Sequence, residues 1–171
     1  MELNRVWAMP NKWTFEISPI RKLIYKYGGD FNGWIDPFAG KNSPAEIRND
    51  LNPEMPAEYH LHAKEFITRI NGKFNGILFD PPYSTRQIKE CYNELGLDMS
   101  FEDTNKFPSN IKKMIASKIK IGGIAICCGW NTVAFGKKLG FKRLEILLVC
   151  HGGHHNDTII TVEQKFQDKL F

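Results

Sequence analysis

The sequence predicts an α/β fold built on an open, mostly parallel β-sheet that finishes with an antiparallel hairpin. Two observations carry this prediction. Short apolar runs typical of buried strands alternate with amphipathic helical stretches. The last two runs are separated only by a turn rich in glycine and histidine, as in a hairpin.

Length and composition indicate a single domain that spans residues 1–171. The formal charge of +4 suits a polyanionic partner, although many metabolic enzymes share such a charge. Residues that resemble a signal peptide or a membrane span are not found, so we expect a cytoplasmic protein that does not contact a membrane. The four cysteines match neither a zinc ribbon nor a disulfide framework, and we expect them to be reduced.

Residues 18–29 are predicted to form the first helix. Ser18 is suited to cap its start, Pro19 fits its first turn, and the glycines at 28 and 29 end it. The apolar face of this helix is formed by Ile20, Leu23, Ile24 and Tyr27. The strand that follows is short and ends at Asp36.

The segment after Asp36 allows two interpretations. Residues 43–46 resemble a capping box, which would start a helix. However, the stretch up to Asp50 is too short for a full helix and another strand. We therefore favour a contracted crossover in which residues 45–49 form a strand that ends at Asp50.

The rest of the chain continues the alternation of strands and helices. A helix capped by Ser109 and ended by Gly122–Gly123 precedes a buried strand. The predicted elements are a short strand at 58–62, a helix at 63–70, a strand at 76–80, the helix at 109–123, a buried strand at 124–130, and the hairpin strands at 143–150 and 157–165.

Polar and aromatic residues follow the predicted strands at the point where each strand ends. In open α/β sheets, ligands bind at the carboxyl ends of the strands. Asp36, Asp50, Asp80 and Trp130 would all lie at that edge. The turn at 151–157 joins them if the strand before it runs parallel to the others. Packing alone does not explain so many such residues on one edge.

The tetrapeptide Asp80-Pro81-Pro82-Tyr83 directly follows an apolar strand. Two prolines fix two φ angles and remove two N–H donors, which leaves backbone carbonyls as acceptors in a rigid turn. A carboxylate beside a carbonyl forms a paired acceptor for an NH₂ group, and the ring of Tyr83 can stack on a flat aromatic ligand. The arrangement fits the exocyclic amine of a nucleobase.

This motif resembles the catalytic motif of amino methyltransferases that use S-adenosylmethionine, above all the N6-adenine DNA methyltransferases. The stretch WIDPFAGKNSPA is similar to their cofactor motif, and TFEISPIRKLI to the helix before it. NDLNPE, CGWNT and VCHGGHHNDTI resemble a compact, phage-type branch of the adenine methylases. The resemblance implies a Rossmann-like class I methyltransferase fold without a separate target-recognition domain, in a bacterial or phage-infected cell.

The resemblance also implies a cofactor site for S-adenosylmethionine. Asp36 and the turn after it would hold the methionine part, and Asp50 would accept hydrogen bonds from the ribose hydroxyls. His62 stands where the family usually has an acid that binds the adenine amine, and Lys41-Asn42 replaces a second glycine of the cofactor loop. The implied cofactor residues are Asp36, Pro37, Phe38, Ala39, Gly40, Asp50 and His62.

For the target, the resemblance implies DNA as partner and the N6 amine of adenine as methyl acceptor. Asp80 and the Pro81 carbonyl would hold the amine, and Tyr83 would stack on a base flipped out of the duplex. The implied catalytic residues are Asp80, Pro81, Pro82 and Tyr83. No metal is required, because the sulfonium of the cofactor is already a strong electrophile.

Further candidates for substrate binding follow from position. Arg86 lies just beyond the catalytic turn and is a candidate for phosphate contact, and Trp130 is suited either to stacking or to packing. The turn with His154 and His155 is expected to line the substrate pocket. The set of Cys150, His151, His154, His155 and Asp157 has no second cluster to complete a metal site, so we expect no metal there.

Several functions remain open at this point. The alternatives are an amino methyltransferase acting on RNA, a free nucleotide, a protein glutamine or cytosine N4, and a binding subunit without activity. Basic and aromatic residues in segments 4–13 and 84–108 are expected to contact nucleic acid. The recognition site should be short, unless the chain forms a homodimer.

Overall fold

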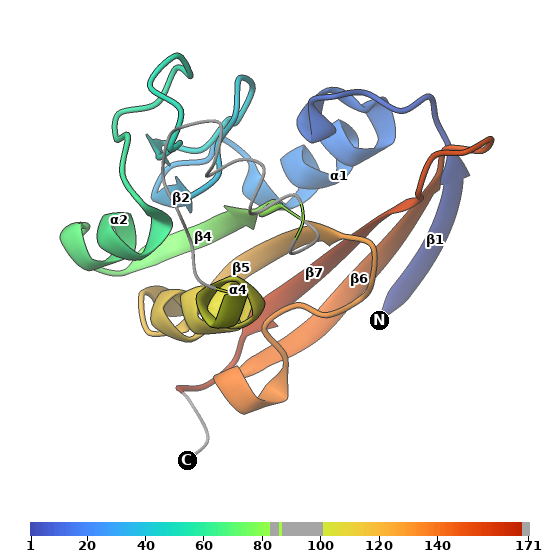
Figure 1. Ribbon diagram of the computed structural model, residues 1–171. Helices are drawn as coiled ribbons and strands as arrows, with labels where there is room; N and C mark the ends of the chain where they lie inside the picture. The colour runs from blue at the N-terminus through green and yellow to red at the C-terminus, as the bar shows by residue number, and fades with distance from the viewer. Residues whose placement is uncertain (83–85, 87–100, 169–171) are drawn as a thin grey trace.

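The protein, described here by a computed structural model, forms a seven-stranded sheet in the order β1-β6-β7-β5-β4-β2-β3 (Figure 1). The structure describes residues 1–82, 86 and 101–168, and the side chains of 101–108 are not included. The strands are β1 (Glu2–Trp7), β2 (Trp34–Asp36), β3 (Ile47–Arg48), β4 (Phe74–Phe79), β5 (Ile119–Gly129), β6 (Phe141–Cys150) and β7 (Thr158–Lys165).

Helices cover both faces of the sheet (Figure 1). The helical elements are η1 (Thr14–Glu16), α1 (Ser18–Gly28), α2 (Ala63–Arg69), α4 (Phe101–Ala116) and η2 (Lys137–Leu139). Alternate side chains of β4 point to opposite faces of the sheet, as in any strand, and so pack against different helices. Leu78 packs with α1, whereas Ile77 and Phe79 pack with α2 and α4.

The mixed topology confirms the predicted fold class. β7 is antiparallel to both of its neighbours, β5 and β6, and all other pairs are parallel. Consequently β6 runs parallel to β5, as the edge argument required. The carboxyl ends of β2, β4, β5 and β6 therefore lie along one edge of the sheet. Of the helices in the described ranges, none is long and apolar enough to cross a membrane.

Of the two predicted boundaries of helix α1, the end is confirmed and the start is wrong. The predicted end is confirmed, because Gly29 has a φ of 59° and its amide closes the last turn onto Tyr25. The predicted cap is wrong, because Ser18 is already helical and Ile17 is the N-cap, without a side-chain hydrogen bond. Pro19 in the first turn, which needs no N–H donor, starts the helix instead.

Two further element boundaries differ from expectation. The helix predicted for 109–123 is instead α4, which begins at Phe101, so Ser109 lies inside it and caps nothing. It ends at Ala116, and Gly122–Gly123 lie within β5. The short strand expected at 58–62 is reduced to a single bridge between Asn49 and Tyr59, although the strand expected before Asp50 is present as β3.

Candidate active site

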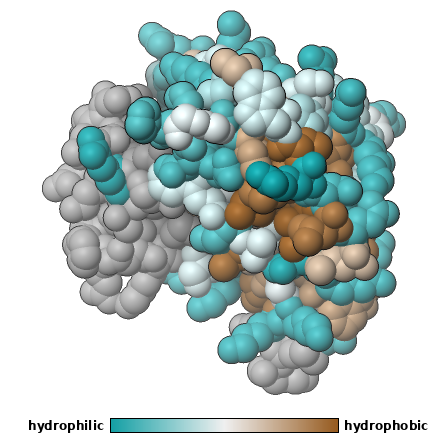
Figure 2. All heavy atoms as spheres, turned by 90° about the vertical axis from the view of Figure 1, so that its right-hand side faces the viewer, coloured by the Kyte–Doolittle hydropathy of each residue, from teal (hydrophilic) through white to brown (hydrophobic). Residues whose placement is uncertain are grey.

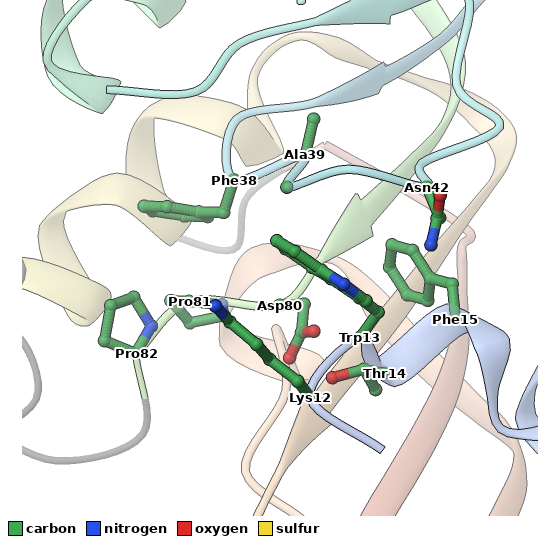
Figure 3. Close-up of a pocket in the computed structure, with 11 residues that line it drawn as sticks. Lys12, Trp13, Thr14, Phe15, Phe38, Ala39, Asn42, Asp80, Pro81 and Pro82 are labelled. Atoms are coloured by element: carbon green, nitrogen blue, oxygen red, sulfur yellow. The ribbon is translucent and has the colours of Figure 1, made fainter. Parts of the chain in front are cut away.

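A cavity of about 490 Å³ lies at the carboxyl edge of the sheet (Figure 3). Three segments distant in the sequence form its walls. They are the loop after β2, the turn after β4, and the N-terminal segment that precedes α1. The lining residues are Lys12, Trp13, Thr14, Phe15, Phe38, Ala39, Gly40, Asn42, Asp80, Pro81 and Pro82.

The loop after β2 is shaped by Asp36, which has no exposed surface. Its two carboxylate oxygens accept hydrogen bonds from the amide of Phe38 (2.9 Å) and the hydroxyl of Ser43 (2.6 Å). A carboxylate buried in this way has no surface to offer a ligand. We therefore assign Asp36 to holding the loop, so that Phe38, Ala39 and Gly40 face the cavity (Figure 3).

Burial raises the pKa of Asp36 from its usual 3.8 to about 7. The negative charges of Asp80 and Asp50 raise it further, while the hydrogen bonds from Ser43 and Phe38 oppose the shift. The folded chain thus retains a proton that the unfolded chain loses near pH 4. Asp36 therefore makes the folded state progressively less stable as the pH rises from about 4 to about 7.

This linkage predicts the behaviour of Asp36→Asn, which keeps the shape of the protonated side chain and does not titrate. Between pH 5 and pH 8, the wild type should lose about 2–3 kcal/mol of unfolding free energy relative to the variant. Urea unfolding of both proteins at the two pH values measures this difference. A difference that is constant with pH would show that Asp36 is ionised throughout the range.

A network around Asn49 and Asp50 fixes the outer side of the same loop. Asp50 accepts hydrogen bonds from the amides of Gly40 (2.8 Å) and Asn52 (2.9 Å), so it lies beside the loop as the sequence suggested. Asn49, which the sequence analysis did not single out, is 1% exposed. Its side chain donates to the carbonyls of Pro37 and Leu61 and accepts from the amide of Leu61.

The N-terminal segment forms the opposite wall and is fastened to the β2 loop. The Trp13 ring lies against Gly40, where an added Cβ would come within 3.1 Å of that ring. Gly40 also has a φ of 55°, which favours glycine. The carboxylate of Glu16 accepts hydrogen bonds from the side-chain amides of Asn42 and Asn11. The Asn42 that replaces the expected second glycine thus joins the two walls.

Asp80, Pro81 and Pro82 form the third wall, at the end of β4, with Trp13 between them and the β2 loop (Figure 3). Phe79, the last residue of β4, makes an edge-to-face contact with Phe38 of the loop after β2, with ring centroids 5.5 Å apart. The predicted turn after β4 and the predicted loop after β2 therefore share one cavity. Tyr83 lies outside the described residues.

The predicted site residues His62, Arg86, Trp130, His154 and His155 do not line this cavity. His62 is the N-cap of α2, where its Nδ1 accepts from the amide of Lys64, and burial lowers its pKa. Trp130 is 42% exposed, directly after β5. Arg86 is exposed, as are His154 and His155 in the turn between β6 and β7.

His151, in the same turn, was not among the predicted site residues, but its structural role is clear. The ring of His151 is buried and hydrogen-bonds the carbonyl of Ala8 and the hydroxyl of Thr158. It thereby ties the end of β6 to the N-terminal segment that continues towards the cavity. Within the described ranges, no group of three or more His, Cys, Asp or Glu side chains is arranged to hold a metal ion.

Several solved structures of methyltransferases share this fold, while the sequence itself matches no protein family and no curated protein. A candidate methyltransferase from Streptococcus mutans, solved with S-adenosylhomocysteine, aligns with a TM-score of 0.51 and 14% identity over 84% of this chain and 96% of its own. An rRNA methylase from Streptococcus thermophilus aligns with a TM-score of 0.53 and 8% identity over 87% and 97% of the two chains.

A third similar structure contains both ligands of its reaction. It is the 1,6-didemethyltoxoflavin-N1-methyltransferase of Burkholderia thailandensis, with 1,6-didemethyltoxoflavin and S-adenosylhomocysteine bound. It aligns with a TM-score of 0.56 and 10% identity over 87% of this chain and 77% of its own. At such identities the likeness concerns the fold, which is therefore the Rossmann-like fold of these methyltransferases.

Proposed function

We propose that the chain binds S-adenosylmethionine and transfers its methyl group to the N6 amine of adenine in DNA. The observation that carries this proposal is the shared cavity. The β2 loop of residues 38–40 and the turn of Asp80, Pro81 and Pro82 face it together. In the family that the sequence resembles, the first of these motifs serves the cofactor and the second the target amine.

The cavity fits the cofactor in size and chemistry. Sites for small ligands enclose roughly 300–1,000 Å³ and are mostly apolar with a few polar groups. This cavity, at about 490 Å³, has aromatic side chains from Trp13, Phe15 and Phe38, and a glycine whose missing side chain lets Trp13 approach. Bound there, S-adenosylmethionine would supply an electrophilic methyl group.

The protein's own contribution to the reaction would be to orient the acceptor amine. Pro81 and Pro82 have no amide hydrogens and hold the turn rigid. The carboxylate of Asp80 and the Pro81 carbonyl can each accept one hydrogen of an NH₂ group, which directs the nitrogen lone pair away from them. The negative charge of Asp80 also offsets the positive charge that develops on the amine during transfer.

DNA adenine is favoured as the substrate by the order and identity of the motifs, and the net charge of +4 suits a polyanion. Two of the similar structures are named for other substrates. One is an rRNA methylase, and the other methylates a small heteroaromatic compound. An RNA substrate is therefore the second candidate.

Binding of the cofactor product is the first test of the proposal. We expect saturable binding of S-adenosylhomocysteine in calorimetry, with a matching rise of the melting temperature. Gly40→Val should remove most of this binding, because a branched side chain at that φ would collide with Trp13. Absence of binding by the wild type at millimolar ligand would refute the proposal.

Glu16 should affect the affinity for S-adenosylhomocysteine without touching the ligand. Because it joins the two walls through Asn42, Glu16→Ala should weaken binding by about three- to tenfold. Asn42→Ala should do the same, and the double variant should be no weaker than either single one. Glu2→Ala, which removes an exposed carboxylate paired with Lys26, is the control and should leave binding unchanged. Additive losses would contradict the joint action of Glu16 and Asn42.

A further inference from the structure

Strand β1 lies at one end of the sheet, and its outer edge has no partner among the described residues (Figure 1). An open edge exposes backbone N–H and C=O groups that can pair with another strand. Many proteins protect such an edge with charged side chains, above all lysine, or with proline. Strand β1 (ELNRVW) contains neither lysine nor proline, and its charged residues are Glu2 and Arg5.

Alternate residues of β1 direct their backbone groups to opposite sides. In the ladder with β6, the amide of Ala8 donates to the carbonyl of Cys150 at a distance of 3.1 Å. The even-numbered residues of β1 therefore face β6. It follows that Leu3, Arg5 and Trp7 direct their N–H and C=O groups outward, where no strand in the described part of the chain pairs with them.

The side chains of the same three residues lie on the sheet face away from α1. The opposite face contains Glu2 and Asn4, which contact Lys26 and Glu145 beside α1. On the outer face Leu3 is 70% exposed and Trp7 65% exposed. Figure 2, which views the molecule from the β1 side, shows an apolar patch crossed by hydrophilic atoms there.

We propose that β1 is a dimerisation edge, on which β1 of a second copy of this chain pairs antiparallel. In such a pair the two-fold axis is perpendicular to the sheet. Odd-numbered residues of one copy therefore lie opposite odd-numbered residues of the other, and even-numbered residues opposite even-numbered ones. With the axis at Asn4, Leu3 faces Arg5 of the second copy and Trp7 faces Met1. The outward backbone groups of these residues then form the hydrogen-bonded pairs of the new ladder.

Charge selects this register over its neighbours. With the axis moved to Arg5, the two Arg5 side chains would face each other, and like charges directly opposite destabilise a sheet. With the axis moved to Leu3, Trp7 would extend beyond the paired region and remain exposed. Of these three registers, the axis at Asn4 is the one that covers Trp7 without opposing like charges. A second copy is thus the occupant that suits this edge in both backbone and side chains.

Charged substitutions at Leu3 test both the dimer and its register. Leu3→Lys places a lysine opposite Arg5 of the second copy and should raise the dimer dissociation constant about tenfold or more. Leu3→Glu places a carboxylate opposite the same arginine and should retain or tighten the dimer. The control is Ile121→Lys, at an equally exposed apolar residue on another strand, which should leave the dimer unchanged. Sedimentation equilibrium on the chain without an N-terminal tag measures all four proteins.

Three outcomes would overturn the inference. The first is a wild-type chain that stays monomeric up to high micromolar concentration. The second is an equal loss of association in Leu3→Lys and Leu3→Glu, which would indicate general apolar contact without the proposed register. The third is an effect of Ile121→Lys as large as that of Leu3→Lys. Binding of S-adenosylhomocysteine is a separate measurement, so the dimer stands or falls independently of the proposed function.

Discussion

Asp80→Ala should lower the rate of methyl transfer by several hundred-fold or more, while the affinity for S-adenosylhomocysteine stays within about threefold of wild type. The reason is the place of the carboxylate, in the turn after β4 and across the cavity from the β2 loop (Figure 3). Loss of a hydrogen bond that positions or activates the nucleophile costs about 3–4 kcal/mol of transition-state stabilisation, by analogy with lost oxyanion-hole donors.

Asp80→Asn is the matched variant, because it keeps the shape of the side chain. It should also be poor, since its amide can turn a donor towards the substrate amine and has no charge to offset the one that develops there. Single-turnover rates with saturating cofactor separate the chemical step from binding. If Asp80→Ala instead abolished binding of S-adenosylhomocysteine, the turn would be part of the cofactor site and the assigned roles would be wrong.

Asn49→Ala should destabilise the fold by about 2–4 kcal/mol, because the substitution leaves the carbonyls of Pro37 and Leu61 without their buried donor. The loop after β2 begins at Pro37, so binding of S-adenosylhomocysteine should weaken as well. Urea unfolding followed by circular dichroism measures the first effect and calorimetry the second.

The control for this variant is Asn75→Ala. Asn75 is exposed, and its side chain donates to Asn32 and accepts from Lys120. Since water can replace these hydrogen bonds, the loss of stability should be below about 1 kcal/mol, with ligand binding unchanged. Equal effects of the two substitutions would show that the burial of Asn49 is not what holds the loop in place.

The fold and the main walls of the site were predictable because their signals are local. A strand followed at once by Asp80 and two prolines specifies the turn, and Asp36 with the glycine at position 40 specifies the loop. Parallel strands then bring both to one edge of the sheet. The alternation of strands and helices was enough to predict this arrangement, and the structure places both segments around one cavity.

The features that were missed depend on contacts between distant residues. Glu16 and Asn42 meet only after folding, and neither belongs to a pattern that distinguishes it from a surface residue. Strand β1 is exposed along most of its length, so it lacks the apolar alternation by which strands are recognised. The predicted helix at 109–123 extends too far because Gly122–Gly123 resemble a helix stop, although both glycines lie within β5, where Ile119 pairs with Phe74.

The most direct test of the proposed function uses labelled S-adenosylmethionine with unmethylated plasmid DNA and, in parallel, with RNA, followed by mass spectrometry of the nucleosides. Asp80→Ala serves as the blank in both reactions. The account predicts N6-methyladenine in the DNA, absent with the blank and at most a trace in the RNA. Methylation of RNA alone, of cytosine N4 alone, or of neither nucleic acid by a chain that binds S-adenosylhomocysteine would contradict it.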